Sequence, residues 1–170
     1  WEGCKSFTGF PPLDLSAGKI FSATWRDCTS LTEFGVEKDD DGNIIAKLNI
    51  SSGEDFTQAW MDCESLTSFP DLDFSSAVTL AGAWRNCTGL TSFPAIDTSN
   101  VVDFGGVVGN GAWQGCSGLT SFPTISLSSA DTLTSTWQGC SGLTSFPLLD
   151  TSGVRKLRKT WSGCDGLTDF

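Results

Sequence analysis

Cysteine has the most reactive side chain in this sequence, and its placement is regular. Each of the seven cysteines follows a tryptophan by three residues, and no tryptophan stands elsewhere. Thiolates bind zinc or act as nucleophiles, but structural zinc sites use closely spaced cysteine pairs and a nucleophile needs an adjacent base. The chain has no Cys-x-x-Cys pair and no His. The spacing therefore favours small buried side chains, and the odd count argues against systematic disulfide pairing.

Carboxylates form a second set of chemical groups, and several of them share one position in the sequence pattern. They stand just before Ser- or Thr-rich segments, at Asp14, Asp73, Asp97 and Asp150. Turn formation and capping by the carboxylate explain this position. A cation held between neighbouring copies of the pattern is the alternative.

The segment GVEKDDDGNII, an insertion at about 35–45, is the best candidate for a metal site. Glu37, Asp39 and Asp41 alternate before Gly42, which partly matches a calcium-binding loop. The closing glutamate of such a loop is missing because position 48 is Leu. Asp-Gly between apolar alternating residues equally predicts a β-hairpin. The two interpretations are compatible, and calcium is the weaker; no other cofactor is predicted.

A second insertion, at about 104–111, contains the glycine-rich segment GGVVGNG. Glycine-rich loops cradle phosphate when they join a strand to a helix and carry a lysine, and neither condition is met here. The segment therefore predicts a flexible loop. Insertions often carry binding in repeat proteins, so both insertions are candidate contact points.

A row of threonines at one repeated position is the candidate binding face. Its members are Thr67, Thr91, Thr120 and Thr144. Because each lies between an apolar Leu and Phe, alternation predicts that the hydroxyl groups face solvent. Threonine also suits exposed strands without any function. The functional alternatives are a platform for a carbohydrate or protein partner, a lattice match to ice, and O-glycosylation.

Charge excludes two classes of partner. Twenty Asp and Glu against ten Lys and Arg give a net charge of −10, which argues against nucleic acid and against anionic membranes. No apolar run approaches a membrane span, so membrane insertion is not expected. Arg155, Lys156, Arg158 and Lys159 form a local exception, interpreted as a solvated helix face.

The residues above are positioned by a repeat. The eleven letters WQGCSGLTSFP occur at 113–123 and again at 137–147, and successive tryptophans are 24, 35, 24, 29, 24 and 24 residues apart. A period in the twenties predicts a solenoid, in which like residues of neighbouring coils stack. The seven coils of this one domain, residues 1–170, start at Trp1, Trp25, Trp60, Trp84, Trp113, Trp137 and Trp161.

Each coil is predicted to contain a short helix and a short strand. Val154, Leu157, Trp161 and Cys164 fall at i, i+3, i+7 and i+10, which is one stripe of a helix. Glycines beside the cysteines, at 115, 139 and 163, are expected to end these helices. The segment Leu-Thr-x-Phe-Pro that follows predicts a strand stopped by proline. The predicted fold is a leucine-rich-repeat-like right-handed α/β solenoid with parallel strands on one side and short helices on the other.

The pattern Trp-x-x-Cys-x-x-Leu-Thr-x-Phe-Pro, followed by Asp-Thr-Ser, resembles the BspA-like leucine-rich repeats. IDTSNV at 96–101 and LDTSGV at 149–154 are also similar to microbial surface-lipoprotein repeats that pair GCSSLTSL with DTSNVT. This chain has Trp where those families mostly have Phe, and it places Pro directly after the strand Phe. The resemblance implies a secreted or surface-attached microbial protein with a role in adhesion, or a component of a phage virion.

The expected function is therefore a non-enzymatic recognition or adhesion module on a cell surface or virion, binding protein or carbohydrate. The alternative is a structural spacer or the subunit of an extracellular fibre. An unstacked coil exposes its core to water. A chain that starts at Trp1 and stops at Phe170 is thus expected to be a piece of a longer array, or to stack head to tail into an oligomer or filament.

Overall fold

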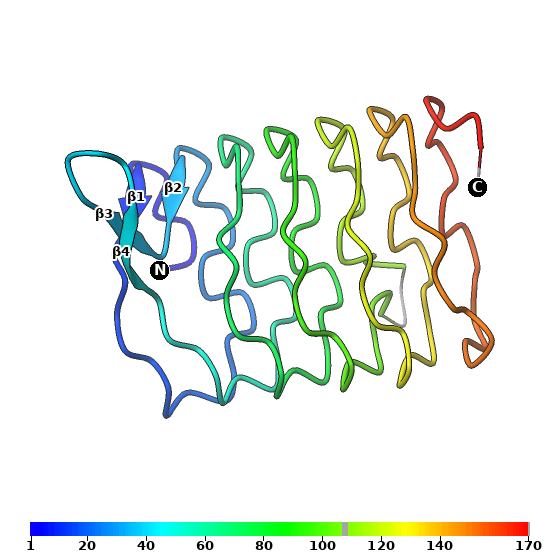
Figure 1. Cartoon of the computed structure of the whole chain (residues 1–170), viewed down its shortest axis with the longest axis horizontal. Helices are drawn as coiled ribbons and strands as arrows, with labels where there is room; N and C mark the ends of the chain where they lie inside the picture. The colour runs from blue at the N-terminus through cyan, green and yellow to red at the C-terminus, as the bar shows by residue number, and fades with distance from the viewer. Residues whose placement is uncertain (107–108, 170) are drawn as a thin grey trace.

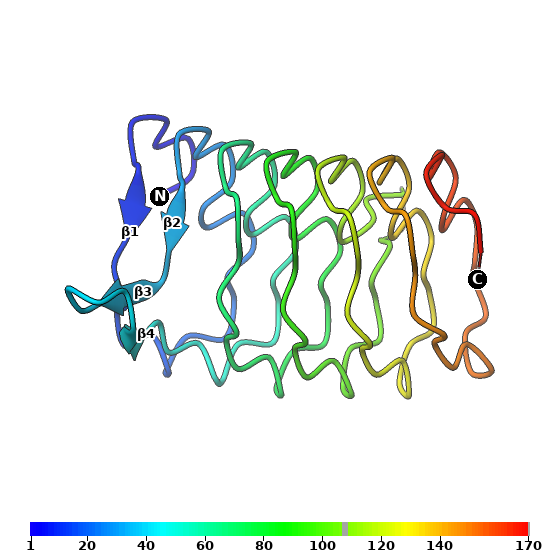
Figure 2. The same ribbon diagram turned by 45° about the horizontal axis from the view of Figure 1, so that its top comes forward.

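The computed structural model describes residues 1–106 and 109–169. The chain winds through successive coils that lie side by side along the long axis, from the N-terminal to the C-terminal end (Figures 1 and 2). In the structure, a coil is one turn of the chain and is named by the tryptophan that it contains. Part of the predicted insertion at 104–111 and the final residue, Phe170, lie outside the described residues.

The predicted leucine-rich-repeat-like α/β solenoid is wrong. The described residues contain no helix, and their only strands are four short ones in two small sheets. These are β1 (Gly9–Phe10), β2 (Glu33–Phe34), β3 (Val36–Lys38) and β4 (Ile44–Lys47). Strands β1 and β2 pair in parallel, and β3 and β4 pair antiparallel. The long parallel sheet and the row of helices are therefore both absent from the described chain.

Left-handed backbone near each tryptophan explains the missing helices. The residue two positions after tryptophan has a positive φ in every coil: Gly3, Asp27, Asp62, Asn86, Gly115, Gly139 and Gly163. In most coils the residue two positions before tryptophan is also left-handed: Ala23, Gln58, Gly82, Ser135 and Lys159. A right-handed helix cannot accommodate such residues within one turn of each other. The glycines expected to end helices serve this left-handed position instead.

Alternate N–H groups in this segment bond to the next coil. The amide of Trp25 donates to the carbonyl of Ala59 at 2.8 Å, and that of Asp27 donates to Met61 at 2.9 Å. The intervening amides bond within the coil, as Arg26 does to the carbonyl of Ala23 at 3.3 Å. All of these donors are thus satisfied without a helix, although the apolar spacing resembles that of a helical stripe.

Proline explains why the parallel sheet stops after β2. Gly35, which follows Phe34, donates its amide to the carbonyl of Phe10 at 2.8 Å and completes the β1–β2 pairing. Later coils carry proline at that position and cannot make this bond: Pro70, Pro94, Pro123 and Pro147. One backbone bond remains there, as from Thr91 to the carbonyl of Thr67 at 3.2 Å.

A ladder of single parallel bridges ties the coils together elsewhere. It runs through Ile20, Asp55, Thr79, Asp103, Thr132 and Lys156. Each step is a backbone pairing of one residue per coil, such as Phe56 donating to the carbonyl of Thr79 at 3.1 Å. These pairings hold neighbouring coils at a fixed spacing and so fix the surfaces described below.

The core is built from stacked aromatic rings. Consecutive tryptophan rings are nearly parallel, with centroids between 5.1 and 6.0 Å apart, from Trp1 through Trp161. The phenylalanine that precedes proline in the repeat packs edge-on against this stack, as Phe93 does against Trp84 at 4.8 Å. The stacking of like residues, which the repeat predicts for tryptophan, is confirmed by these contacts.

The β3–β4 hairpin projects from the N-terminal end of the molecule (Figure 1). The hairpin predicted for the first insertion is thereby confirmed. Val36 pairs with Lys47, and a register irregularity falls between Glu37 and Lys38. At the tip, Gly42 has a φ of +83° and donates its amide to the carbonyl of Asp39 at 3.0 Å.

Candidate functional site

The threonine row is exposed and its backbone is fixed. All four candidate residues, Thr67, Thr91, Thr120 and Thr144, are exposed to solvent. The amide of Thr120 donates to the carbonyl of Thr91 at 3.3 Å, and the amide of Thr144 donates to that of Thr120 at 3.1 Å. Bonds of this kind place successive members about 4.8 Å apart, so the row is roughly 14 Å long.

Three of the four threonine hydroxyl groups are also hydrogen-bonded along the row. Thr91, Thr120 and Thr144 each donate to the carbonyl of the preceding threonine, at 3.4, 3.3 and 3.2 Å. A hydroxyl has one proton and two lone pairs, so these groups offer acceptors and methyl groups to a partner, and their protons are already used. Such a surface suits a partner that supplies hydrogen-bond donors.

The hairpin and the first threonine of the row meet at a cleft of about 330 Å³. Thr67 and Ser68 line one part of it, and Val36, Lys38 and Ile44 of the hairpin line another. The first insertion and the threonine row, which were separate sequence candidates, thus share one site. The sequence shows no sign of the contact because the two elements belong to successive coils.

The calcium candidates lie on and beside the hairpin tip. Glu37 is on β3, and Asp39 is the residue that organises the turn. One oxygen of Asp39 accepts hydrogen bonds from the amides of Asp41 and Asn43, at 3.1 and 2.7 Å. The hydrogen bonds from Asn43, side chain first, lower the pKa of Asp39. No group of three His, Cys, Asp or Glu residues suited to a metal occurs among the described residues.

The repeated aspartates form turns, which confirms that interpretation. The amide two residues on donates to the carboxylate in each case, at 3.0 Å for Asp14 and 2.9 Å for Asp73, Asp97 and Asp150. Hydrogen bonds from the serine two residues on lower the pKa of Asp14, Asp97 and Asp150. The expected helix capping is wrong, because no helix follows.

All seven cysteines are free thiols, and all but Cys4 are buried. From the second coil on, each Sγ donates to the tryptophan carbonyl of the preceding coil, as Cys116 does to Trp84 at 3.0 Å. Burial raises the pKa of Cys63 and of Cys116 to about 12. Thiolate chemistry is therefore suppressed at these positions, and the thiols act as packed, weakly hydrogen-bonded core groups.

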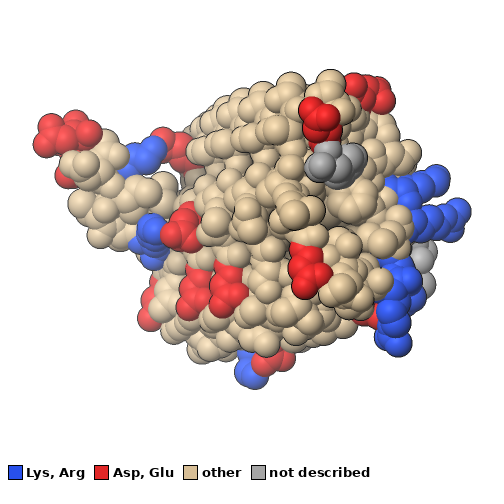
Figure 3. Space-filling view, turned by 45° about the vertical axis from the view of Figure 1, so that its right-hand side comes forward, with Lys and Arg blue, Asp and Glu red and all other residues tan. Residues whose placement is uncertain are grey.

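The basic segment at 155–159 is the main functional candidate that sequence reasoning misjudged. It is not a helix face, since the described residues contain no helix. Lysine and arginine gather at this C-terminal end, and acidic residues occupy the hairpin tip at the other end (Figure 3). Arg158 and Lys159 line a pocket with the distant Arg85. One feature of the sequence could have pointed to this pairing. Arg85 and the basic segment are the two ends of a long stretch that contains no Lys or Arg.

Comparison with known protein families, with curated proteins and with solved structures found no match. Among the described residues, no helix has the length and apolar character needed to cross a membrane.

Proposed function

We propose that this protein is a non-enzymatic recognition module, exposed on a microbial cell surface or a virion, that binds a protein or carbohydrate partner. Contact is made by the threonine row together with the β3–β4 hairpin. The similarity of the repeat to microbial surface-lipoprotein sequences supports an extracellular location. No cofactor is part of this proposal.

The observation that carries the proposal is the cleft where the hairpin meets the threonine row. It combines the apolar side chains of Val36 and Ile44, the ion pair of Lys38 with Glu33 and the hydroxyl of Thr67 in one concave surface. Apolar walls with a few convergent polar groups are the usual composition of a binding site. The adjoining row extends the contact surface with hydrogen-bond acceptors that the backbone holds in place. Because these groups are already ordered, the protein loses little conformational entropy when a partner binds.

The proposal is tested by binding of the whole chain to an array of glycans and to intact host or microbial cells. Binding to a partner found in this way should be lost in the variant Ile44→Asp, which places a charge in the cleft. It should also be lost in Thr120→Arg, which blocks the row. Val78→Arg is the matched control, because Val78 is exposed but lies beside the bridge ladder, away from the row. Equal loss for all three variants, or no binding in either format, would count against the proposal.

A second candidate, a structural spacer or fibre subunit, is favoured by the continuous tryptophan stack. Rings spaced 5.1 to 6.0 Å apart from the first coil to the last make a stiff element whose length grows with each coil. A spacer or fibre subunit should bind nothing in the arrays and should form extended assemblies in light scattering. Binding without assembly favours the recognition module.

A further inference from the structure

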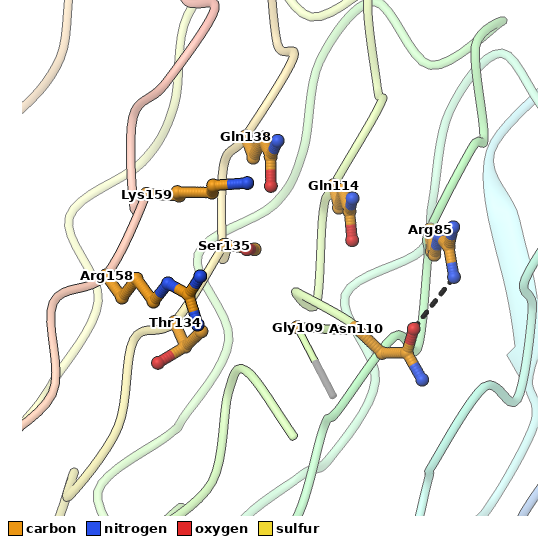
Figure 4. A pocket seen from close by; sticks show the side chains of 9 residues that line it. All are labelled: Arg85, Gly109, Asn110, Gln114, Thr134, Ser135, Gln138, Arg158 and Lys159. Carbon is orange, nitrogen blue, oxygen red and sulfur yellow. Dashed lines mark hydrogen bonds between the residues drawn. The ribbon is translucent and has the colours of Figure 1, made fainter. Parts of the chain in front are cut away.

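A pocket of about 540 Å³ lies near the C-terminal end of the stack, away from the threonine row. Its walls come from coils far apart in sequence. Arg85 and Asn110 stand on one side, Arg158 and Lys159 stand on the other, and glutamine side chains extend between them (Figure 4). The full lining is Arg85, Gly109, Asn110, Gln114, Thr134, Ser135, Gln138, Arg158 and Lys159. No carboxylate is present in this lining.

The cations of this pocket differ from the others in the protein by their lack of acidic partners. Six of the seven remaining Lys and Arg residues form salt bridges. Arg85, Arg158 and Lys159 form none with a carboxylate of the described residues. In a chain with twice as many acids as bases, three unpaired cations around one hollow create a local positive potential.

Arg85 is held in place with unused hydrogen-bonding capacity. Its Nη1 donates to Oδ1 of Asn110 at 2.8 Å, which fixes the guanidinium plane. Its Nε is buried and has no hydrogen-bond partner among the described residues. A buried donor without a partner is costly.

The rest of the lining suits hydroxyl groups. The side-chain amides of Asn110, Gln114 and Gln138 can both donate and accept, as can the hydroxyls of Thr134 and Ser135. Ring hydroxyls of a sugar need this mixture, whereas a simple inorganic anion needs donors alone. The volume lies within the range of small-ligand sites.

We propose that this pocket, called here the cationic pocket, binds an acidic sugar residue of an anionic saccharide. The carboxylate or sulfate group of that residue pairs with Arg158 and Lys159. Its hydroxyl groups exchange hydrogen bonds with the amides of Gln114 and Gln138. The cationic pocket shares no residue with the threonine row or the hairpin cleft, so this site is independent of the function proposed above.

Calorimetric titration of the whole chain tests the proposal with four probes. They are a uronate-containing disaccharide, a sulfated disaccharide, a neutral disaccharide of the same size, and inorganic phosphate. Both acidic disaccharides should saturate one site, and the neutral disaccharide and phosphate should bind at least tenfold more weakly. Phosphate binding as tightly as the acidic sugars would overturn the saccharide assignment. Equal binding of acidic and neutral sugars, or no saturation by any probe at millimolar concentration, would overturn the site itself.

Paired variants connect the binding to the pocket. Arg158→Gln combined with Lys159→Gln should weaken the acidic disaccharides by tenfold or more, because each removes a charge-assisted hydrogen bond. Arg155→Gln is the control: Arg155 is in the same basic segment but pairs with Asp131 and does not line the cationic pocket. The affinity of the Arg155→Gln variant for the acidic disaccharides should stay within about twofold of the wild-type value. These side chains are exposed, so melting temperatures should not change, and equal weakening by both variants would refute the assignment.

Discussion

Replacing Trp84 separates the two contributions of a buried indole, its ring and its N–H group. Trp84 is fully buried, and its ring lies between those of Trp60 and Trp113, each 5.3 Å away. Phe93 contacts it edge-on at 4.8 Å. Its Nε1 is buried and has no hydrogen-bond partner among the described residues.

Two substitutions at this position should have very different costs. Trp84→Ala opens a cavity and removes the stacking contacts, so we expect a loss of about 4–5 kcal/mol in the free energy of unfolding. Trp84→Phe keeps a ring between the neighbouring tryptophans and buries a few tens of Å² less, which costs about 1–2 kcal/mol with its cavity. Removing the unpaired N–H offsets this by about 1–3 kcal/mol. The net change for Trp84→Phe should be within about 1 kcal/mol.

Urea unfolding followed by far-ultraviolet circular dichroism measures both costs. The dependence on urea concentration should keep the wild-type slope, because a shallower slope would indicate that only part of the stack unfolds. Thr91→Ala is the surface control and should change stability by less than about 1 kcal/mol, since its hydroxyl is exposed. A cost for Trp84→Phe equal to that for Trp84→Ala would refute the reasoning, because it would show that the indole N–H is not a liability.

Three further predictions concern the backbone, the thiols and the hairpin. Gly139→Ala should cost about 1–2 kcal/mol in the same urea titration, from backbone strain alone, because φ is +77° and the nearest atom would lie 3.7 Å from the new Cβ. Gly142→Ala should cost more, since its Cβ would lie 2.4 Å from a carbonyl oxygen of the preceding coil; the reverse order would contradict the close approach of the coils. Burial raises the pKa of Cys63 to about 12, above the ordinary value of about 8.5. Its stabilising contribution is thus complete below about pH 8.5 and is lost as pH rises toward 12, so urea midpoints should fall between pH 8.5 and 10.5. A flat profile over that interval would show that the thiol ionises without unfolding. Asn43→Ala should raise the pKa of Asp39 toward its ordinary value in an NMR carboxyl titration, and an unchanged pKa would exclude the side-chain bond from Asn43 as the main cause.

The inside and outside of the molecule could be predicted from the sequence. Between the two terminal coils, tryptophan, cysteine and leucine at the repeated positions are buried, and the threonine between leucine and phenylalanine is exposed. The hairpin was also predictable, because Asp41-Gly42 supplies a residue that tolerates positive φ between two apolar segments. Burial and exposure follow from residue types that recur in each repeat, and the hairpin follows from its own turn residues. The local sequence is therefore sufficient to predict both.

The backbone conformation was decided by contacts between coils. The spacing of Leu80, Trp84 and Cys87 fits a helical stripe, but a segment that contains left-handed Asn86 satisfies the same burial when its amides bond to the next coil. Likewise, a Leu-Thr-x-Phe segment forms a strand only where the partner position carries an N–H, as at Gly35. Hydrogen bonds between residues a full coil apart outweigh local propensity here, and a local apolar pattern does not contain them.

The cationic pocket depended on tertiary structure alone. Arg85 and the pair Arg158 and Lys159 belong to coils that stacking brings to one hollow, and residues 86–154 between them contain no Lys or Arg. In the sequence, Arg158 and Lys159 therefore belong to a local basic segment interpreted as a solvated face, and nothing connects Arg85 with it. Only the stacked coils place the three cations around one volume, because long-range backbone pairing fixes the distance between side chains that the linear order keeps far apart.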